Sequence, residues 1–241
     1  MSKINSINKV NGNTQLWPRH AVANHRIDMA EIEPPIFLKP YKLKRFAAKE
    51  NIYREGDRAE AVYVIRSGLV KLLSYLPNGR ARIVRLLGKG SWIDLGGLLN
   101  KPHEHTAVAV GDIEIYCIPV NRLHALKVNE PQKFFQFMEK LYEHLREADM
   151  WISQFSTGAI KPRVARLVSF LSNIEYGESS TLVDLLTVHE MADILGVTPE
   201  SVSRILAEFK RNDILHKLEG GPPHELYQLD TKMLFNVALD C

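Results

Sequence analysis

The sequence contains little cysteine: two of its 241 residues, Cys117 and Cys241. Two thiols exclude a zinc site built on several cysteines, and they exclude an iron–sulfur cluster held by four thiolates of one chain. Such low cysteine usage fits a reducing compartment, where disulfides are rare. We therefore expect a cytoplasmic protein.

Long apolar runs are also missing. None approaches the roughly 18 residues that a helix needs to cross a bilayer. The opening residues, MSKINSINKVNGNTQ, have no apolar segment of the kind found in secretory signals. We expect no membrane partner. The composition, 45% hydrophobic and 24% charged, is that of a globular protein, and the length allows one large or two modest domains.

Short alternating runs between glycine and proline residues dominate residues 31–130, which we expect to form a β-domain. The strand-like stretches are AVYVIRSG (61–68), LVKLLSYLPNGRARIVRLLGKG (69–90) and IEIYCIP (113–119). Pro77-Asn78-Gly79 between two such runs is a strong hairpin signal. The spacing predicts a β-barrel, a jelly roll or a sandwich. Residues 1–30 are polar and rich in asparagine, and we expect a flexible extension there.

A long helix is predicted within residues 131–160. Its apolar residues step alternately by four and three, which is the a/d heptad seam of a coiled coil over about three repeats. The seam consists of Phe134, Met138, Leu141, Leu145, Ala148, Ile152 and Phe155. Packing against the chain's own β-domain usually gives a wider apolar stripe. The pattern therefore favours a two-stranded homodimer, with a core helix as the alternative.

Residues 161–241 contain two short amphipathic segments separated by Gly196, which permits a sharp turn. The small Ala192 lies four residues before this glycine, and the β-branched Val202 and Ile205 follow six and nine residues after it. These offsets predict a helix-turn-helix, in which two steeply crossing helices touch at a small residue. A plain αα-hairpin is the alternative. The later stretch ILHKLEGGPPHELYQL (214–229) predicts two strands around a turn, hence a β-wing.

Polar residues occupy the outer face at the start of the second segment, VTPESVSRILAEFKRNDIL (197–215). Glu200, Ser203 and Arg204 are spaced i, i+3 and i+4, so they share one face. In an isolated helix this would be a solvated face with a local Glu–Arg pair. In a helix-turn-helix the same face enters the major groove, where Arg204 can contact guanine and Glu200 can accept from cytosine.

Residues near the two helix starts are candidates for phosphate contacts, which fix register without reading sequence. These candidates are Arg163, Thr187, His189, Thr198 and Ser201. The overall charge argues against DNA, because residues 161–241 hold eight Lys and Arg against twelve Asp and Glu, a net charge of −4. Affinity must then come from local placement of a few basic residues. These are Arg163, Arg166, Arg204, Lys210 and Arg211.

Over about residues 31–235 the chain resembles the CRP/FNR family of bacterial transcription regulators. The stretches that carry the resemblance are NIYREGDRAEAVYVIRSGLVKL (51–72), GKGSWIDLGGLL (88–99) and LTVHEMADILGVTPESVSRILAEFKRNDIL (186–215). It implies an α+β fold with three parts. These are an N-terminal double-stranded β-helix (jelly-roll-like) sensor domain over 31–130, a dimerisation helix over 131–160 and a C-terminal winged helix-turn-helix over 161–241.

The resemblance also implies partners. The segment ESVSR looks like the E-x-x-S-R of FNR-type recognition helices. It implies a homodimer on double-stranded DNA, at a palindromic TTGAT-like site, with RNA polymerase as a further partner.

The effector is where the chain departs from the family. Cyclic-AMP-binding members hold the ribose with a glutamate and the phosphate with an arginine, and here Leu95 and His105 stand at those positions. Leucine cannot accept a hydroxyl bond, and a neutral imidazole replaces a bidentate guanidinium poorly. We therefore expect no cyclic AMP binding of the usual kind. Residues 1–35 lack cysteine, which excludes the iron–sulfur cluster of oxygen-sensing members. The effector stays unidentified, with haem or another small molecule as options.

The candidate effector pocket suggests a different function class. Its members are Trp92, Leu95, His103, His105 and Thr106. GLLNKPHEH (97–105) matches the opening of a cupin motif, in which two imidazoles on one strand face bind a metal. The glutamate that this motif needs is missing from TAVAVGD (106–112). The alternative to a DNA-binding regulator is therefore a metal-dependent cupin-like enzyme using His103 and His105, which leaves the C-terminal domain unexplained. On the leading interpretation, a DNA-binding regulator, we expect no catalytic residues and no metal site.

Overall fold

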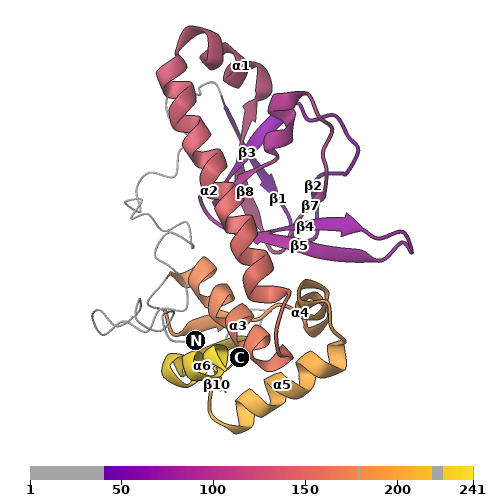
Figure 1. Cartoon of the computed structure of the whole chain (residues 1–241), viewed down its shortest axis with the longest axis vertical. Helices are drawn as coiled ribbons and strands as arrows, with labels where there is room; N and C mark the ends of the chain where they lie inside the picture. The colour runs from indigo at the N-terminus through magenta and orange to yellow at the C-terminus, as the bar shows by residue number, and fades with distance from the viewer. Residues whose placement is uncertain (1–40, 178–179, 219–224, 241) are drawn as a thin grey trace, which may run out of the picture.

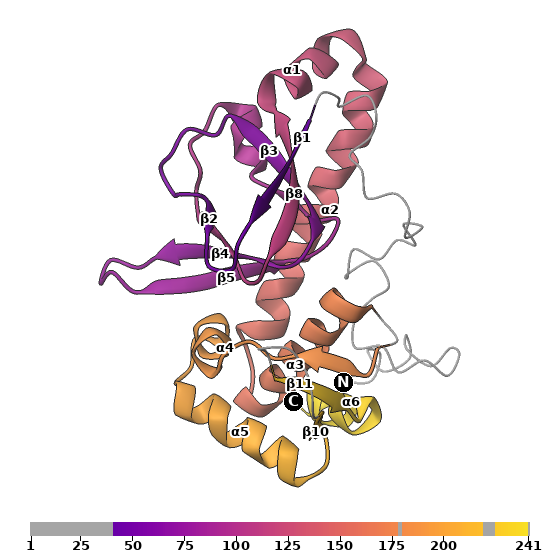
Figure 2. The same ribbon diagram turned by 180° about the vertical axis from the view of Figure 1, so that it is seen from behind.

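The computed structural model describes residues 41–177, 180–218 and 225–240, apart from five side chains. Those side chains are Leu126, Gln136, Phe137, Lys140 and Leu141. The expected extension at residues 1–30 and the expected turn of the wing lie outside the described residues, as does the side chain of the seam residue Leu141. A β-domain and a helical C-terminal domain are joined by one long helix, which Figures 1 and 2 show from opposite sides.

Eight strands form the β-domain as two antiparallel sheets, ordered β1-β8-β3-β6 and β2-β7-β4-β5. Their bounds are β1 (Lys42–Phe46), β2 (Asn51–Tyr53), β3 (Ala61–Ser67), β4 (Val70–Tyr75), β5 (Ala81–Leu87), β6 (Trp92–Ile93), β7 (Thr106–Ala109) and β8 (Ile113–Pro119). The chain passes back and forth between the sheets, so alternate side chains of both fill one core. This arrangement confirms the predicted jelly-roll-like β-helix.

The predicted hairpin joins β4 and β5, which pair from Val70 with Leu87 to Tyr75 with Ala81. Gly79 has a φ of 78°, in the left-handed region where glycine is unstrained. The hairpin reaches out from the side of the β-domain in both views.

Two helices follow the β-domain, α1 (Val120–Asn129) and α2 (Pro131–Phe155). Between β6 and β7 lies a short 3-10 helix, η2 (Leu95–Leu99).

The inner face of α2 is anchored to β5, because Arg85 Nη2 donates to Glu147 Oε2 at 2.9 Å and Arg85 Nη1 lies 2.8 Å from His144 Nε2. Burial, together with the charge of Arg85, lowers the pKa of His144 to about 4. His144 is therefore neutral and can accept the bond from Arg85.

The predicted seam on α2 is only partly right. Phe155 is 1% exposed and packs with Trp151 and Phe170, while Phe134 packs against the β-domain cluster around Val62. Phe134 and Phe155 therefore pack inside the same chain and are not part of an exposed seam. The exposed apolar stripe of α2 consists of Phe135, Met138, Tyr142, Leu145 and Ile152. Ala148 is half-buried.

The C-terminal part packs helices around a small sheet ordered β10-β11-β9. Its elements are α3 (Ile160–Tyr176), β9 (Leu182–Asp184), α4 (Val188–Leu195), α5 (Pro199–Arg211), β10 (Leu215–Lys217), β11 (Leu226–Leu229) and α6 (Thr231–Leu239). Leu167, Phe209 and Tyr227 are fully buried at its centre. Ile83 and Leu86 of β5 join the same cluster, so the β-domain packs against this part. Within the described residues, no helix is both long and apolar enough to span a bilayer.

Candidate nucleic-acid interface and effector region

The first helix of the helix-turn-helix, α4, is fixed at its start by a capping box. Thr187 Oγ1 accepts from the Glu190 N–H, and Glu190 Oε2 accepts from the Thr187 N–H at 3.1 Å. The two bonds satisfy backbone donors that an α-helix leaves free at its first turn.

A tight turn then sets the angle between α4 and α5. Gly196 ends α4 with a φ of 64°, and its N–H donates to the Ala192 carbonyl. Ala192 is 2% exposed, and Val202 and Ile205 of α5 are buried in the same cluster. These contacts are the ones predicted from the offsets around Gly196. Thr198 caps α5 by accepting from the Ser201 N–H at 3.3 Å.

The first turns of α5 present Glu200, Ser203 and Arg204 to solvent, as predicted. No ion pair joins Glu200 to Arg204 in the described structure, so the face is not closed by a local pair. Hydrogen bonds from the helix backbone and from Thr198, with His189 nearby, lower the pKa of Glu200. The carboxylate is therefore ionised, and its remaining lone pairs can accept bonds from a ligand.

Four of the five candidate phosphate contacts lie at the helix starts. Thr187, His189 and Thr198 are exposed, and Ser201 is partly exposed beside Thr198, with the two hydroxyl oxygens 3.1 Å apart. Thr187 and Thr198 also act as helix caps, so their side chains are held in place.

Arg163 differs from the prediction. It is 7% exposed, and its guanidinium donates to the carbonyl of Phe155 at 2.8 and 2.5 Å and to the carbonyl of Leu195. Those carbonyls are at the C-terminal ends of α2 and α4, where helices leave acceptors unpaired. Arg166 is also turned inward, and it donates to the carbonyls of Gln154 and Ala238. Both arginines hold helices together, which is why Arg163 is not on the outer face.

Arg163→Ala should therefore act on stability. The change leaves two buried carbonyls without their donor, and we expect the free energy of unfolding to fall by about 2–4 kcal/mol. Lys161→Ala is the control: Lys161 lies on α3 like Arg163, its partly exposed pair is with Glu208 of α5, and the loss should be about 1 kcal/mol or less. Urea unfolding measures both. If Arg163→Ala keeps wild-type stability but lowers the salt dependence of DNA binding, Arg163 contacts phosphate instead.

The basic residues that remain exposed are concentrated on α5. Arg204, Lys210 and Arg211 are exposed along this helix, and the Lys210 ammonium lies 4.8 Å from the centre of the Tyr227 ring. Three exposed cations on one helix can attract a DNA backbone locally even though the C-terminal residues are acidic overall.

An ion pair links the β-domain to the helix-turn-helix. Lys71 Nζ of β4 lies 2.6 Å from Glu190 Oε1, and both side chains are mostly buried. Burial acts to raise the pKa of Glu190, but hydrogen bonds from Lys71 and Thr187 outweigh it and lower the pKa. Glu190 is thus ionised, and it serves both the cap of α4 and the contact between the two parts.

The candidate effector residues do not form one open pocket. His103 is 3% exposed, and its Nδ1 lies 2.7 Å from Asp94 Oδ2. The His103 ring stacks on Tyr53 with centroids 3.9 Å apart, and Tyr53 stacks on Tyr63. Burial raises the pKa of Asp94, although His103 opposes this effect. These side chains fill the interior of the β-domain here.

Three of the other four candidates also pack inside the β-domain. Thr106 is 4% exposed, and its hydroxyl accepts from the Glu55 N–H. Trp92 and Leu95 pack against the apolar cluster around Val62, while His105 is partly exposed. Among the described residues no group of three His, Cys, Asp or Glu side chains could hold a metal ion.

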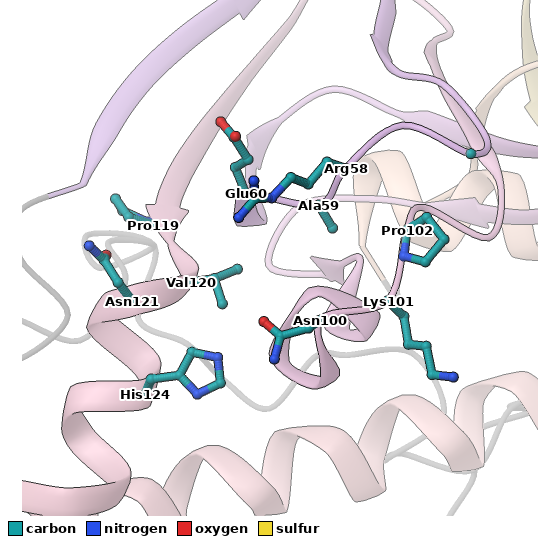
Figure 3. A pocket seen from close by; sticks show the side chains of 11 residues that line it. Arg58, Ala59, Glu60, Asn100, Lys101, Pro102, Pro119, Val120, Asn121 and His124 are labelled. Carbon is teal, nitrogen blue, oxygen red and sulfur yellow. The ribbon is translucent and has the colours of Figure 1, made fainter.

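A cavity of about 740 Å³ lies elsewhere on the β-domain, between the β2–β3 loop, the end of η2 and the start of α1 (Figure 3). Its polar lining includes Arg58, Glu60, Asn100, Lys101, Asn121 and His124. Sequence reasoning missed these residues. They come from three separate segments, and none of those segments carries a motif that marks them.

Comparison with known proteins gives matches to two separate parts of the chain. Residues 43–129 match the family described as cyclic nucleotide-binding domain, and residues 165–234 match the Crp-like helix-turn-helix domain. The chain is 26% identical to the transcriptional regulator LdrP of Thermus thermophilus, over 72% of this chain and 87% of LdrP. It is 27% identical to the transcriptional activator protein Anr of Pseudomonas protegens, over 73% of each chain. The structure of FixK2 from Bradyrhizobium japonicum shares the fold, with a TM-score of 0.71 at 22% identity over 83% of this chain and 98% of FixK2.

Proposed function

We propose that this chain, which belongs to the CRP/FNR family of DNA-binding transcription regulators, acts as a homodimer on an inverted-repeat DNA site. Its relatives are transcription regulators and not enzymes, which excludes the cupin-like alternative.

The observation that carries the proposal is the outward face of α5. Glu200, Ser203 and Arg204 are exposed at the start of a helix whose opposite face is buried. Arg204 can donate two bonds to O6 and N7 of guanine, and Glu200 can accept from N4 of cytosine. Ser203 can touch a neighbouring base. With the resemblance to FNR-type recognition helices, these residues favour a TTGAT-like half-site.

Phosphates would lie against the helix starts. Thr187, His189, Thr198 and Ser201 surround the N-terminal ends of α4 and α5, where free N–H groups and the helix dipole favour an anion. Contacts of this kind set the position of α5 in the groove and carry no sequence information.

The exposed stripe of α2 supports the homodimer. Phe135, Tyr142 and Leu145 are each 64–67% exposed, which is unusual for large apolar side chains on one helix face. Two copies that pair along this stripe would bury it and relate their α5 helices by a two-fold axis. Such a dimer would match two inverted half-sites about one helical turn apart.

We infer that the protein works in the cytoplasm and contacts RNA polymerase. We also infer that it responds to a small molecule, and that it does not bind cyclic AMP in the way usual for the family. The interior of the β-domain supports the last point, because Asp94, His103 and Tyr53 pack against one another there.

The test is a binding selection from random duplexes with the purified full chain. We expect an inverted repeat of TTGAT-like half-sites, one helical turn apart, with two protein chains per duplex. Enrichment of a single unpaired half-site, or of no sequence at all, would contradict the proposed mode of binding.

A further inference from the structure

The cavity beside α1 is lined by polar side chains that come from three elements. Figure 3 shows Arg58 of the β2–β3 loop, Asn100 at the end of η2 and His124 of α1 directed into the same space around Val120. The Lys101 side chain and the Glu60 carboxylate point away from this space in the same view. The volume, about 740 Å³, is within the range of small-molecule sites.

Among the described residues, these three side chains have no hydrogen-bond or ion-pair partner. In the described structure no hydrogen bond or ion pair involves the side chain of Arg58, Asn100 or His124, although ion pairs engage several other cations of the β-domain. Asn100 is held in a left-handed conformation, with φ 54° and its N–H donating to the carbonyls of Gly96 and Gly97. Its amide is therefore positioned by the backbone rather than by a side-chain partner.

The chemistry of the three groups is that of an anion site. A guanidinium donates two parallel bonds to a phosphate or carboxylate, and an amide and an imidazole add single donors beside it. The apolar floor consists of Ala59, Pro119 and Val120, two of which are buried. Such a floor can take the uncharged part of a ligand.

We propose that this cavity binds a small anionic metabolite, whose phosphate or carboxylate group is held by Arg58, Asn100 and His124. The site is separate from the buried group in which Tyr53, Asp94 and His103 pack against one another inside the β-domain.

The position of the cavity connects it to the dimer helix. The ligand would bridge η2 and the start of α1, and both elements pack in one apolar cluster with Phe134 of α2. A ligand that draws Arg58 and His124 together would therefore bias the position of α2 against the β-domain. This regulatory consequence rests on the proposed function, whereas binding of the anion does not.

The experiment follows the His124 imidazole signal in the full-length protein labelled on histidine, assigned by its loss in His124→Ala. The probes are inorganic phosphate, AMP and citrate, with adenosine as the uncharged counterpart of AMP. We expect AMP or citrate, or both, to shift the His124 signal saturably below about 10 mM, while adenosine leaves it unchanged. A stronger response to AMP assigns a phosphate group, and a stronger response to citrate assigns carboxylates.

Matched variants localise the binding. Arg58→Ala should raise the Kd at least tenfold, and Arg58→Lys should raise it less, because it keeps the charge but loses the fork. Glu60→Gln removes the acidic group of the lining and should leave the Kd unchanged or lower it. The proposal is overturned if no charged probe shifts His124, if adenosine binds as well as AMP, or if Arg58→Ala binds like the wild type. None of these readouts involves DNA, so failure here is separate from failure of the proposed function.

Discussion

Replacing Leu145 with glutamate is expected to convert the proposed dimer into a monomer. Leu145 is 64% exposed in the middle of the apolar stripe of α2, so replacing it should disturb the fold of the single chain little. In a parallel two-stranded pairing the residue meets its own copy, and two carboxylates would then be desolvated against each other. Sedimentation at low micromolar protein should show a monomer, and affinity for the inverted repeat should fall sharply because one half-site is lost.

Two further variants separate loss of pairing from loss of folding. Leu145→Met keeps an apolar side chain of similar volume and should remain dimeric. Leu145→Lys should also be monomeric alone, but an equimolar mixture with Leu145→Glu should form a heterodimer by pairing opposite charges. A dimer that survives Leu145→Glu, or a mixture that stays monomeric while both variants keep wild-type helix content, would place the interface elsewhere.

The apolar pattern of α2 predicts a helix with an apolar face, but it does not say which partner covers that face. The period of α2 predicted the helix and an apolar contact along it, and both are present. The pattern could not separate a face that packs inside the chain from one that meets a second copy, because both use the same residue types. Phe134 and Phe155 therefore entered the predicted seam, whereas Phe135 and Tyr142 were left out of it.

The helix-turn-helix was predictable because its signals are local. A capping box, a glycine in the left-handed region and a small residue at the crossing act within about 20 residues, and the structure has all three. Arg163 lies in the same domain but depends on distant partners, the carbonyls of Phe155 and Leu195. Its charge suggested a surface role, and only the fold reveals that it is buried.

In the β-domain, too, local features were predictable and contacts between distant residues were not. Alternation and turn residues predicted the strands, and the resemblance supplied their arrangement. The pair of His103 with Asp94 could not be foreseen from the sequence, because it depends on how η2 and the following loop fold back over Tyr53. The cavity around Arg58 likewise depends on three segments that meet only in the fold, namely the β2–β3 loop, the end of η2 and the start of α1.

Replacing Arg204 with alanine is expected to remove most of the sequence preference at one base pair of each half-site. Arg204 is exposed on the leading face of α5, and no ion pair engages it within the part of the chain that the structure describes, so its guanidinium is available for O6 and N7 of guanine. The loss should be about 1–3 kcal/mol per half-site, or about 2–6 kcal/mol for a site read by both copies. Equilibrium binding to the selected duplex, and to duplexes with that base pair changed, measures affinity and preference together.

The controls distinguish base reading from charge. Arg204→Lys keeps the positive charge but not the bidentate geometry, so it should keep the salt dependence of binding and still lose the preference for guanine. Glu200→Ala should relax the preference at a different base pair, because its ionised carboxylate would accept from cytosine. Ser201→Ala, at the capped start of α5, should weaken all duplexes about equally, as expected for a phosphate contact. If Arg204→Ala instead keeps the wild-type motif and affinity, the outward face of α5 is only a solvated surface, and the DNA must be read by another part of the chain.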